Sequence, residues 1–595
     1  MEGKELEDFI FKKALSNAYK HNGKAETQAV LRKILFKYPE LRPKVRELIL
    51  KINEVVSKIN QLSIEEQYNY LVALYPEELK EEKIQAKALE LPPLPNAEKY
   101  KLIVTRFAPN PDGPLHLGNI RAALLSHEYA RKYKGRFIIR FEDTDPRTKK
   151  PILNLFEDEK SDYEYILRDL EWLYIIPDEI YIQSDRLKIY YDIAKEIIKK
   201  GGAYLCFCDQ EKIKRYRNEG IPCEHREKSV EENLEQFDKS IKGDFLNTKN
   251  PPVLRIKTDI KHPNPSVRDW IAFRHINPSI YPHPRIKKIR EYLGYDPSFW
   301  PTYNFSVSVD DHLMNITHVF RAKEHIVNTV KQSYIYKWMG WNEPESIHYG
   351  RINFENVVLS KTRIREMIKE GKLEGYADPD LATILSLRKR GFLPDTIREV
   401  ILELGVKPVE AKISLENLYS INRKKIDSIA NRYFFVYQPQ EVYLINDKEI
   451  IVKRQLHPSR NEYFELKLKP SNSFIKIYVC KNDLENVKEV RLIEIGNVKI
   501  MNENGKIFAK FIDDQSIEYA RKNSLNFIQW VYDEFKVNAL VKCPSSFSKD
   551  KKIFGYAEKE VMNLKIGTLI QFLRFGFVKL DEILSNEILF YYTHN

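Results

Sequence analysis

Residues that could bind a nucleotide lie together in the segment RFAPNPDGPLHLGNIR, residues 106–121. His116 and Asn119 fall on the first turn of an expected helix, where free amide donors and the positive end of the helix dipole attract phosphate. Gly118 between them lacks a side chain, so an adenine ring could approach the backbone there. The chain contains neither a GxxxxGK[ST] loop nor a GxGxxG fingerprint, which makes this turn the candidate nucleotide site. The residues alone also allow an ordinary Pro/Gly turn with a capping histidine.

Three of the five cysteines and one histidine form a second candidate site. They occur as a Cys-x-Cys pair, Cys206 and Cys208, and a Cys-x-His pair, Cys223 and His225. Two such pairs closed by one loop suit a tetrahedral zinc ion with no vacant position, which is typical of a structural metal. The alternative is a pair of reduced cysteines beside a hydrogen-bonded histidine. Five cysteines in 595 residues do not form a disulfide framework.

The elements that would position the nucleotide site form a compact βαβ unit. Residues 101–107 read as a buried strand, 109–114 as a turn, 116–134 as a helix and 136–141 as a second strand. In such a unit the helix begins at the carboxyl end of a parallel strand, where α/β proteins bind their ligands. The sequence therefore predicts the first half of a nucleotide-binding domain over residues 96–180.

An insertion is predicted to split this nucleotide-binding fold. From about residue 180 to residue 300 the pattern is irregular and rich in proline, and residues 305–309 and 317–320 then read as strands again. We therefore expect the insertion to span residues 181–299 and the second half of the domain to span residues 300–350.

Residues 1–95 are predicted to form an all-helical appendage. Seven apolar residues recur at helical spacing in it, which is most simply a packing face. They are Val45, Leu48, Ile49, Ile52, Val55, Val56 and Ile59. The segment Leu91-Pro-Pro-Leu-Pro95 cannot continue a helix and marks the boundary.

The remainder of the chain changes from a helical to a β pattern. Residues 351–432 show helical periodicity, whereas residues 433–595 contain short alternating strands such as Tyr463–Leu468. The dipeptide Asn504-Gly505 is a hairpin signal. We expect a helical domain followed by β-barrels. The predicted fold class is thus multidomain α/β plus β.

Composition and charge limit the class of protein. Apolar residues make up 43% and charged residues 31%, and no run approaches the roughly 18 apolar residues of a membrane helix. The first thirteen residues mix acidic, basic and apolar types and form neither a secretory signal nor a transit peptide, so we expect a soluble, cytoplasmic chain without membrane contact. The formal charge of +12 favours an anionic partner, although a merely basic surface would give the same value.

Residues 106–121 resemble the HIGH motif of class I aminoacyl-tRNA synthetases, in the form typical of glutamyl and glutaminyl enzymes. Those enzymes read R-F-[AP]-P-x-P-x-G-x-L-H-[IL]-G-x and then R-F-[DE]-D-T-[DN]-P, which stands here as residues 140–146. Asn119 replaces the final histidine of the motif, and its amide can still donate to a phosphate. The resemblance implies a Rossmann-type catalytic domain that binds ATP with Mg²⁺, with His116 and Asn119 as catalytic residues. The ATP-binding residues that it implies in this segment are Pro109, His116, Gly118 and Asn119.

The segment Val358-Leu-Ser-Lys-Thr362 resembles the KMSKS loop, the second signature of this class. By this resemblance Ser360 and Lys361 bind ATP, and Lys361 is catalytic because it can neutralise charge that develops in the transition state. Val358 stands where the motif has its first lysine, so the phosphate contact of that lysine is not carried over. Without the resemblance, this segment reads as a surface loop.

The same resemblance implies four residues that face the amino-acid substrate. Arg106 faces carboxylate groups, Glu142 the α-ammonium and Tyr303 the side-chain terminus. Arg321 stands where glutaminyl enzymes carry an uncharged residue and glutamyl enzymes carry arginine, so it is expected to pair with the γ-carboxylate. An unpaired guanidinium against a neutral amide costs on the order of several kcal/mol, and Arg321 therefore favours glutamate over glutamine. Read by itself, it would be a surface arginine.

The resemblance extends over about residues 97–590, through Gln571-Phe-Leu-Arg-Phe-Gly-Phe-Val-Lys-Leu-Asp581 near the end. It implies that the β-barrels bind the anticodon and that the insertion binds the acceptor stem. Glutamyl enzymes of several lineages carry a similar Cys/His cluster in that insertion, which favours structural Zn²⁺. The N-terminal helices resemble in position appendages that recruit other synthetases, so a protein partner is an open interpretation for them.

The predicted activity is that of glutamyl-tRNA synthetases of the archaeal and eukaryotic kind. Such an enzyme forms glutamyl adenylate from L-glutamate and ATP and transfers glutamate to the 3′-terminal adenosine of tRNA(Glu). Whether it also charges tRNA(Gln) stays open. The competing hypotheses are a glutaminyl-tRNA synthetase, which Arg321 opposes, a small-molecule nucleotidyltransferase, and a non-catalytic paralogue that binds tRNA.

Overall fold

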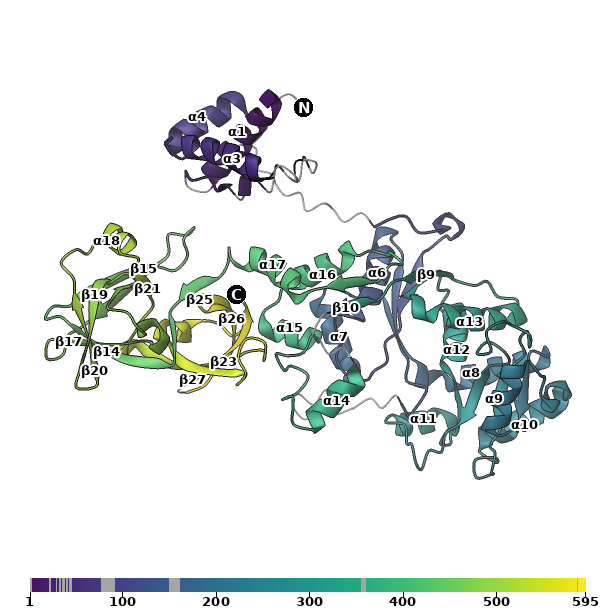
Figure 1. Ribbon diagram of the computed structural model, residues 1–595. Helices are drawn as coiled ribbons and strands as arrows, with labels where there is room; N and C mark the ends of the chain where they lie inside the picture. Colours follow the sequence, from purple (N-terminus) through teal and green to yellow (C-terminus); the bar gives the residue numbers. More distant parts are fainter. Residues whose placement is uncertain are drawn as a thin grey trace. The chain divides into compact units, whose positions relative to one another are not determined.

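The chain forms two compact units, Met1–Pro92 and Pro93–Asn595, in a computed structural model (Figure 1). The structure describes residues 3–20, 23–27, 29–31, 34, 38, 41, 45–75, 91–148, 161–354, 360–585 and 587–595. Within these ranges, no helix is long and apolar enough to cross a membrane.

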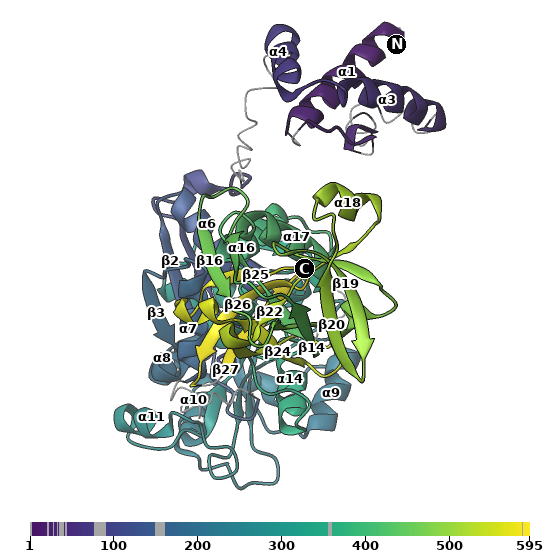
Figure 2. The same ribbon diagram turned by 90° about the vertical axis from the view of Figure 1, so that its left-hand side faces the viewer.

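The first unit is a small helical bundle. Its helices are α1 (Gly3–Lys20), α3 (Val45–Ile59) and α4 (Ile64–Leu74). Helix α1 packs against both α3 and α4 (Figure 2). Leu48, Ile52, Val56 and Ile59 of α3 are buried, as a packing face requires. Helix α4 begins with a capping box in which Ser63 and Glu66 bond each other's backbone amides.

A five-stranded parallel sheet with the order β3-β2-β1-β8-β9 forms the centre of the second unit. Its strands are β1 (Val104–Phe107), β2 (Arg136–Phe141), β3 (Glu179–Ile182), β8 (His318–Ala322) and β9 (Glu345–Tyr349). Helices α6 (Ile120–Lys132), α7 (Asp162–Trp172) and α13 (Ile326–Met339) connect them. Strand β1 pairs with β8 although more than 200 residues separate them, because β1 and β8 belong to the two halves of one domain. The predicted split α/β fold is confirmed.

The prediction of a strand at residues 305–309 is wrong. This segment lies in helix α12, Tyr303–Leu313. The apparent alternation came from Phe305, Val307 and Val309, but the serines between them are buried as well. A helix buried all round has no polar face, so its periodicity does not distinguish it from a strand.

The insertion between the two halves has more regular structure than its irregular pattern indicated. It contains a four-stranded antiparallel sheet, β4-β5-β6-β7. The strands are β4 (Ala203–Cys206), β5 (Val253–Ile256), β6 (Ile271–His275) and β7 (Phe299–Pro301), and the helices are α8 (Leu187–Lys199), α9 (Gln210–Glu219), α10 (Val230–Lys242) and α11 (Ile286–Leu293). Strands this short, separated by long polar segments, produce too few alternations to be recognised from sequence.

The region after β9 is mainly helical, as predicted. It contains α14 (Lys361–Lys369), α15 (Ile384–Arg390), α16 (Pro394–Glu403) and α17 (Leu415–Ile426), with a parallel strand pair, β10 (Ile352–Phe354) and β11 (Ala411–Ile413). The turn at residues 115–117 is bonded to this region, because the Leu117 amide donates to the Ala382 carbonyl and the Ile384 amide to the Leu115 carbonyl. The helical region thus helps to fix the candidate nucleotide site.

The C-terminal part forms two barrel-like seven-stranded sheets, with orders β12-β25-β26-β27-β23-β24-β13 and β21-β18-β19-β20-β14-β17-β22. The first contains β12 (Asn431–Tyr433), β13 (Phe435–Tyr437), β23 (Lys536–Lys542), β24 (Lys552–Glu558), β25 (Leu569–Phe572), β26 (Gly576–Ile583) and β27 (Glu587–His594). The second contains β14 (Pro439–Ile445), β17 (Phe474–Cys480), β18 (Glu489–Leu492), β19 (Gly496–Glu503), β20 (Lys506–Phe511), β21 (Asn526–Ile528) and β22 (Val531–Tyr532). A separate hairpin, β15 (Ile450–Gln455) with β16 (Tyr463–Leu468), and helix α18 (Ile517–Lys522) complete this part.

The hairpin predicted at Asn504-Gly505 is confirmed. Glu503 pairs with Lys506, so the loop has two residues, whose φ angles are 51° and 79°. Positive φ at both positions is typical of a type I′ turn, which Asn-Gly accommodates without strain.

The last strand, β27, attaches the first barrel-like sheet to the helical region. Arg390 of α15 donates to the backbone carbonyls of Tyr592 and Thr593. His594 is 1% exposed, contacts the Asn422 side chain at 3.1 Å and stacks on Tyr419. Burial lowers the pKa of His594 to about 4.

We expect acidification from pH 7.5 to pH 5 to destabilise this attachment. The pKa of His594 is lower in the folded than in the unfolded protein. At pH values between these two pKa values, the unfolded chain therefore binds more protons than the folded chain. The contribution of the neutral ring is complete above about pH 6.5 and is lost as the pH falls towards 4, with a total on the order of 3 kcal/mol. The midpoint urea concentration of unfolding, measured at both pH values, should fall less in His594→Gln than in the unaltered protein. Equal losses in the two proteins would contradict this assignment.

Candidate active site

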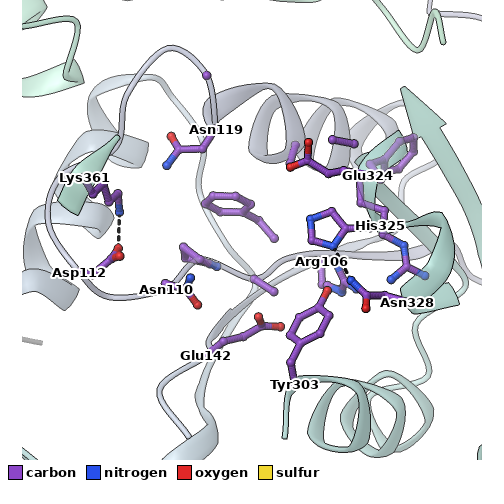
Figure 3. A pocket seen from close by; sticks show the side chains of 18 of the residues that line it. Arg106, Asn110, Asp112, Asn119, Glu142, Tyr303, Glu324, His325, Asn328 and Lys361 are labelled. Atoms are coloured by element: carbon purple, nitrogen blue, oxygen red, sulfur yellow. Dashed lines mark hydrogen bonds and ion pairs between the residues drawn. The ribbon is translucent and has the colours of Figure 1, made fainter. Parts of the chain in front are cut away.

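A cavity of about 650 Å³ opens at the carboxyl edge of the parallel sheet (Figure 3). Segments that follow β1, β2 and β8 line it, as the rule for ligand sites in open α/β sheets predicts. The predicted residues that it brings together are Arg106, Pro109, His116, Gly118, Asn119, Glu142, Tyr303, Arg321 and Lys361. In Figure 3, Lys361 and Asp112 lie on one side of the cavity, and Arg106, Tyr303 and His325 on the other.

The turn at the start of α6 is closed by its own polar side chains. The His116 amide donates to Oδ1 of Asn119 at 3.0 Å, and the Gly118 amide donates to Nδ1 of His116 at 3.0 Å. Burial, followed by the charge of Lys361, lowers the pKa of His116 to about 4. The ring is therefore neutral near pH 7. Because Nδ1 accepts a hydrogen bond, the proton lies on Nε2, which can donate to a ligand in the cavity.

Lys361 is the first residue of α14 and contacts the HIGH-like turn on its own side of the cavity. Its Nζ lies 2.7 Å from Oδ1 of Asp112 and 3.2 Å from the carbonyl oxygen of Gly113. Ser360 caps the helix by accepting from the Arg363 amide. Ser360 lines an adjoining cavity of about 510 Å³, which shares His116, Gly118 and Asn119 with the first. Val358, at the start of the KMSKS-like segment, lies outside the described residues.

Arg106 and Glu142 belong to a buried charge network beneath the cavity. Arg106 makes two hydrogen bonds of 3.1 Å to Asp311, and the fully buried Arg140 lies 2.7 Å from Asp311 and 3.5 Å from Glu142. The two guanidinium groups hold the pKa of Asp311 down to about 2, in spite of the burial that opposes its ionisation. Arg106 is thus held in place by an acidic residue that the sequence reasoning did not identify.

Arg321 differs from the other buried arginines of the cavity. One nitrogen donates to Gln332 at 3.0 Å and another to Ser346 at 3.1 Å, and the residue is 7% exposed. Among the described residues, no carboxylate lies within 4.0 Å of its guanidinium, and Nε has no hydrogen-bond partner. Burial lowers the pKa of Arg321 and raises that of the neighbouring Tyr303. The cavity therefore presents a buried cation that no described carboxylate contacts directly.

Several residues of the cavity were missed by the sequence reasoning. They are Asp112, Glu324, His325, Asn328 and Tyr349. Asp112 lies inside the HIGH-like turn, and Glu324 and His325 follow Arg321 directly, so proximity to a recognised motif was the available signal. His325 contacts Asn328 at 3.1 Å, and burial lowers the pKa of His325.

The four predicted metal ligands come together in the insertion. Their ligand atoms all lie within 4.8 Å of one another, and the cysteines are free thiols. Sγ of Cys223 lies 3.6 Å from Sγ of Cys206, 3.3 Å from Sγ of Cys208 and 3.1 Å from Nδ1 of His225. Ligand atoms of a tetrahedral zinc site with bonds near 2.3 Å are about 3.8 Å apart, so the cluster fits zinc after small adjustments.

Known protein families match two consecutive stretches of the second unit. Residues 102–428 match the catalytic domain of class I tRNA synthetases (E and Q), and residues 430–513 match the anticodon-binding domain of the same synthetases. A glutamate–tRNA ligase of Pyrococcus abyssi is 46% identical over 599 residues, covering 99% of this chain and 100% of that one. The glutamate–tRNA ligase of Pyrococcus furiosus is 45% identical over 597 residues, with the same coverage.

The solved structure of a glutamate tRNA ligase from Elizabethkingia meningosepticum is 23% identical, with a TM-score of 0.38. The alignment covers 55% of this chain and 70% of that one, and this likeness is too distant to add to the assignment. The match to the catalytic-domain family extends over more than half of the chain, and the alignments with the two Pyrococcus proteins cover 99% of the chain. This chain therefore belongs to the class I tRNA synthetases for glutamate and glutamine.

Proposed function

We propose that this protein is a glutamate–tRNA ligase, which activates L-glutamate with ATP and transfers it to tRNA(Glu). The names of the full-length relatives support the assignment. The observation that carries the choice of glutamate is Arg321, a buried guanidinium in the cavity without an acidic partner among the described residues.

The charges around the cavity explain why Arg321 needs an anionic ligand. Arg106 and Arg140 are matched by Asp310, Asp311 and Glu142, all of which lie within 4 Å of one of them. Arg321 has no such partner among the residues that the structure describes, and a buried unpaired charge is costly. A γ-carboxylate would neutralise it through two parallel hydrogen bonds, whereas the amide of glutamine would leave the charge uncompensated.

The reaction proceeds in two steps. The α-carboxylate oxygen of glutamate attacks the α-phosphorus of Mg-ATP, the bond to the bridging oxygen breaks, and glutamyl adenylate and pyrophosphate result. The 2′-hydroxyl of the terminal ribose of tRNA then attacks the carbonyl carbon, AMP leaves, and the hydroxyl proton is released. No protein nucleophile is needed, because the cavity holds the reactants in position and stabilises charge.

Two residues would act on ATP directly, and a third would hold one of them in place. The neutral His116 donates from Nε2, Asn119 closes the turn that carries it, and Lys361 places its ammonium at the phosphates, where charge develops in the transition state. Pro109, Gly118 and Ser360 complete the walls of the two adjoining cavities. On the glutamate side, Glu142 would receive the α-ammonium, with Tyr303 beside the γ-carboxylate that pairs with Arg321.

ATP-dependent pyrophosphate exchange, with and without tRNA, tests this function directly. We expect exchange and tRNA charging with glutamate and little of either with glutamine. Charging assays on tRNA(Glu) and tRNA(Gln) would establish whether the enzyme uses the second tRNA, a use that the proposal leaves open. Faster charging with glutamine than with glutamate would overturn the choice of amino acid, and absence of adenylate formation would overturn the enzymatic function.

A structural zinc ion is proposed for Cys206, Cys208, Cys223 and His225. The short distances between their ligand atoms support it, and zinc in such a set has no catalytic position left. It would fix the loop between β4 and α10 in the insertion.

We expect about one zinc per chain by elemental analysis, because four ligands close one tetrahedral site. Cys208→Ser should lose the metal and should lower the midpoint temperature of unfolding, since a structural metal contributes folding free energy. Cys480→Ser is the matched control, because this buried cysteine lies in β17 outside the cluster. Metal-free protein with an unchanged unfolding midpoint, or zinc retained in Cys208→Ser, would contradict the assignment.

A further inference from the structure

An acidic side chain, Asp112, lies at the place where ATP phosphates are expected. It lines the cavity beside His116 and Lys361 and is part of the HIGH-like turn. A carboxylate near phosphates is repelled by them, so its presence there calls for a compensating role. Within the part of the chain that the structure describes, its one ion pair is with Lys361, at 2.7 Å.

The ammonium of Lys361 has three N–H donors, and the structure accounts for two of them. One is directed to Oδ1 of Asp112 and another to the carbonyl oxygen of Gly113 at 3.2 Å. Two acceptors from adjacent residues fix the orientation of an ammonium group that would otherwise rotate freely on a flexible stem. Among the described residues the third donor meets no acceptor, so it is left for a ligand in the cavity, which Lys361 also lines.

Neighbouring residues restrict the positions of Gly113 and of the start of α14. Gly113 has a φ of +119°, and a Cβ there would lie 3.3 Å from the ring of Tyr376, so only glycine suits this position. The hydroxyl of Tyr376 accepts from Arg365 at 3.1 Å, and Arg365 also pairs with Asp162 at 3.2 Å. Since Lys361 and Arg365 lie one turn apart on α14, the start of this helix is attached to the catalytic domain at two points.

We propose that Asp112 is a positioning residue, which together with the Gly113 carbonyl fixes the Lys361 ammonium over the cavity before ATP binds. This inference rests on the proposed function. The ion pair is partly exposed, with side-chain exposures of 16% for Lys361 and 25% for Asp112, so its contribution to folding is small. Instead, the ion pair holds the lysine where charge develops in the transition state. A cation stabilises that charge better when its position is fixed beforehand.

Glutamate-dependent pyrophosphate exchange in four proteins tests the inference: the unaltered enzyme, Asp112→Ala, Lys361→Ala and the double variant. We expect Asp112→Ala to lower the exchange rate constant about tenfold, and Asp112→Asn, which keeps an acceptor, to lower it about threefold. In the Lys361→Ala background, Asp112→Ala should cause no further loss, because Asp112 acts only through the lysine. A merely structural role would lower the rate in both backgrounds.

Asp296→Ala is the matched control, because Asp296 is a half-exposed acid that pairs with Arg290 at 2.7 Å outside the cavity. Its exchange rate should equal that of the unaltered enzyme. The inference is overturned if Asp112→Ala and Asp112→Asn exchange at the unaltered rate or faster, or if the loss persists in the Lys361→Ala background. Absence of exchange in the unaltered enzyme would overturn the proposed function and this inference with it.

Discussion

Substitution of Arg321 by alanine is expected to lower kcat/KM for glutamate in pyrophosphate exchange by at least ~100-fold. Removing one member of a buried ion pair leaves the other charge uncompensated, at a cost of about 3–5 kcal/mol, and here that charge is the γ-carboxylate of the substrate. Arg321→Lys keeps the charge but cannot reproduce two parallel hydrogen bonds, so its loss should be smaller.

The same variant should change the choice of amino acid. Without the guanidinium, glutamine no longer meets an unpaired buried cation, so the ratio of kcat/KM for glutamate over glutamine should fall. Arg290→Ala is the matched control, because its guanidinium is exposed and pairs with Asp296 in the insertion. If Arg321→Ala charged glutamate at the rate of the unaltered enzyme, the γ-carboxylate would have to be bound by another residue.

Lys361→Ala should lower the rate constant of adenylate formation by roughly 10²–10³-fold. A preorganised cation at the place where charge develops in the transition state contributes this order of magnitude in comparable sites. Single-turnover measurements with saturating glutamate and ATP would report the chemical step without contributions from product release. Lys372→Ala is the control, since this lysine is exposed, lies just beyond α14 and pairs with Glu370.

The defect of Lys361→Ala should be confined to the first step. Once glutamyl adenylate is supplied, no phosphate is transferred, and the rate constant for transfer to tRNA should stay within about threefold of that of the unaltered enzyme. An equal loss in both steps would indicate that the variant disturbs the whole cavity and would contradict the role assigned to the ammonium.

Much of the fold followed from local patterns. Strand β2 has the bounds predicted for it, Arg136–Phe141, because both its faces are buried and four of its six residues are apolar or aromatic. The Asn504-Gly505 turn was predictable because positive φ is a property of these two residues themselves. Helix α12 was not, because it is surrounded by protein and lacks the polar face that marks a helix in sequence.

The sequence by itself determined the family motifs and the candidate metal ligands, because each set lies within a short stretch of chain. Only the tertiary structure decided which charges are compensated. Arg106 meets Asp311 across 205 residues, and Lys361 meets Asp112 across 249. The environment of Arg321 is set in the same way. Its guanidinium donates to Gln332 and Ser346, and no described carboxylate lies within 4.0 Å of it. Burial and charge neutralisation depend on residues far apart in the chain, which local propensity and spacing do not specify.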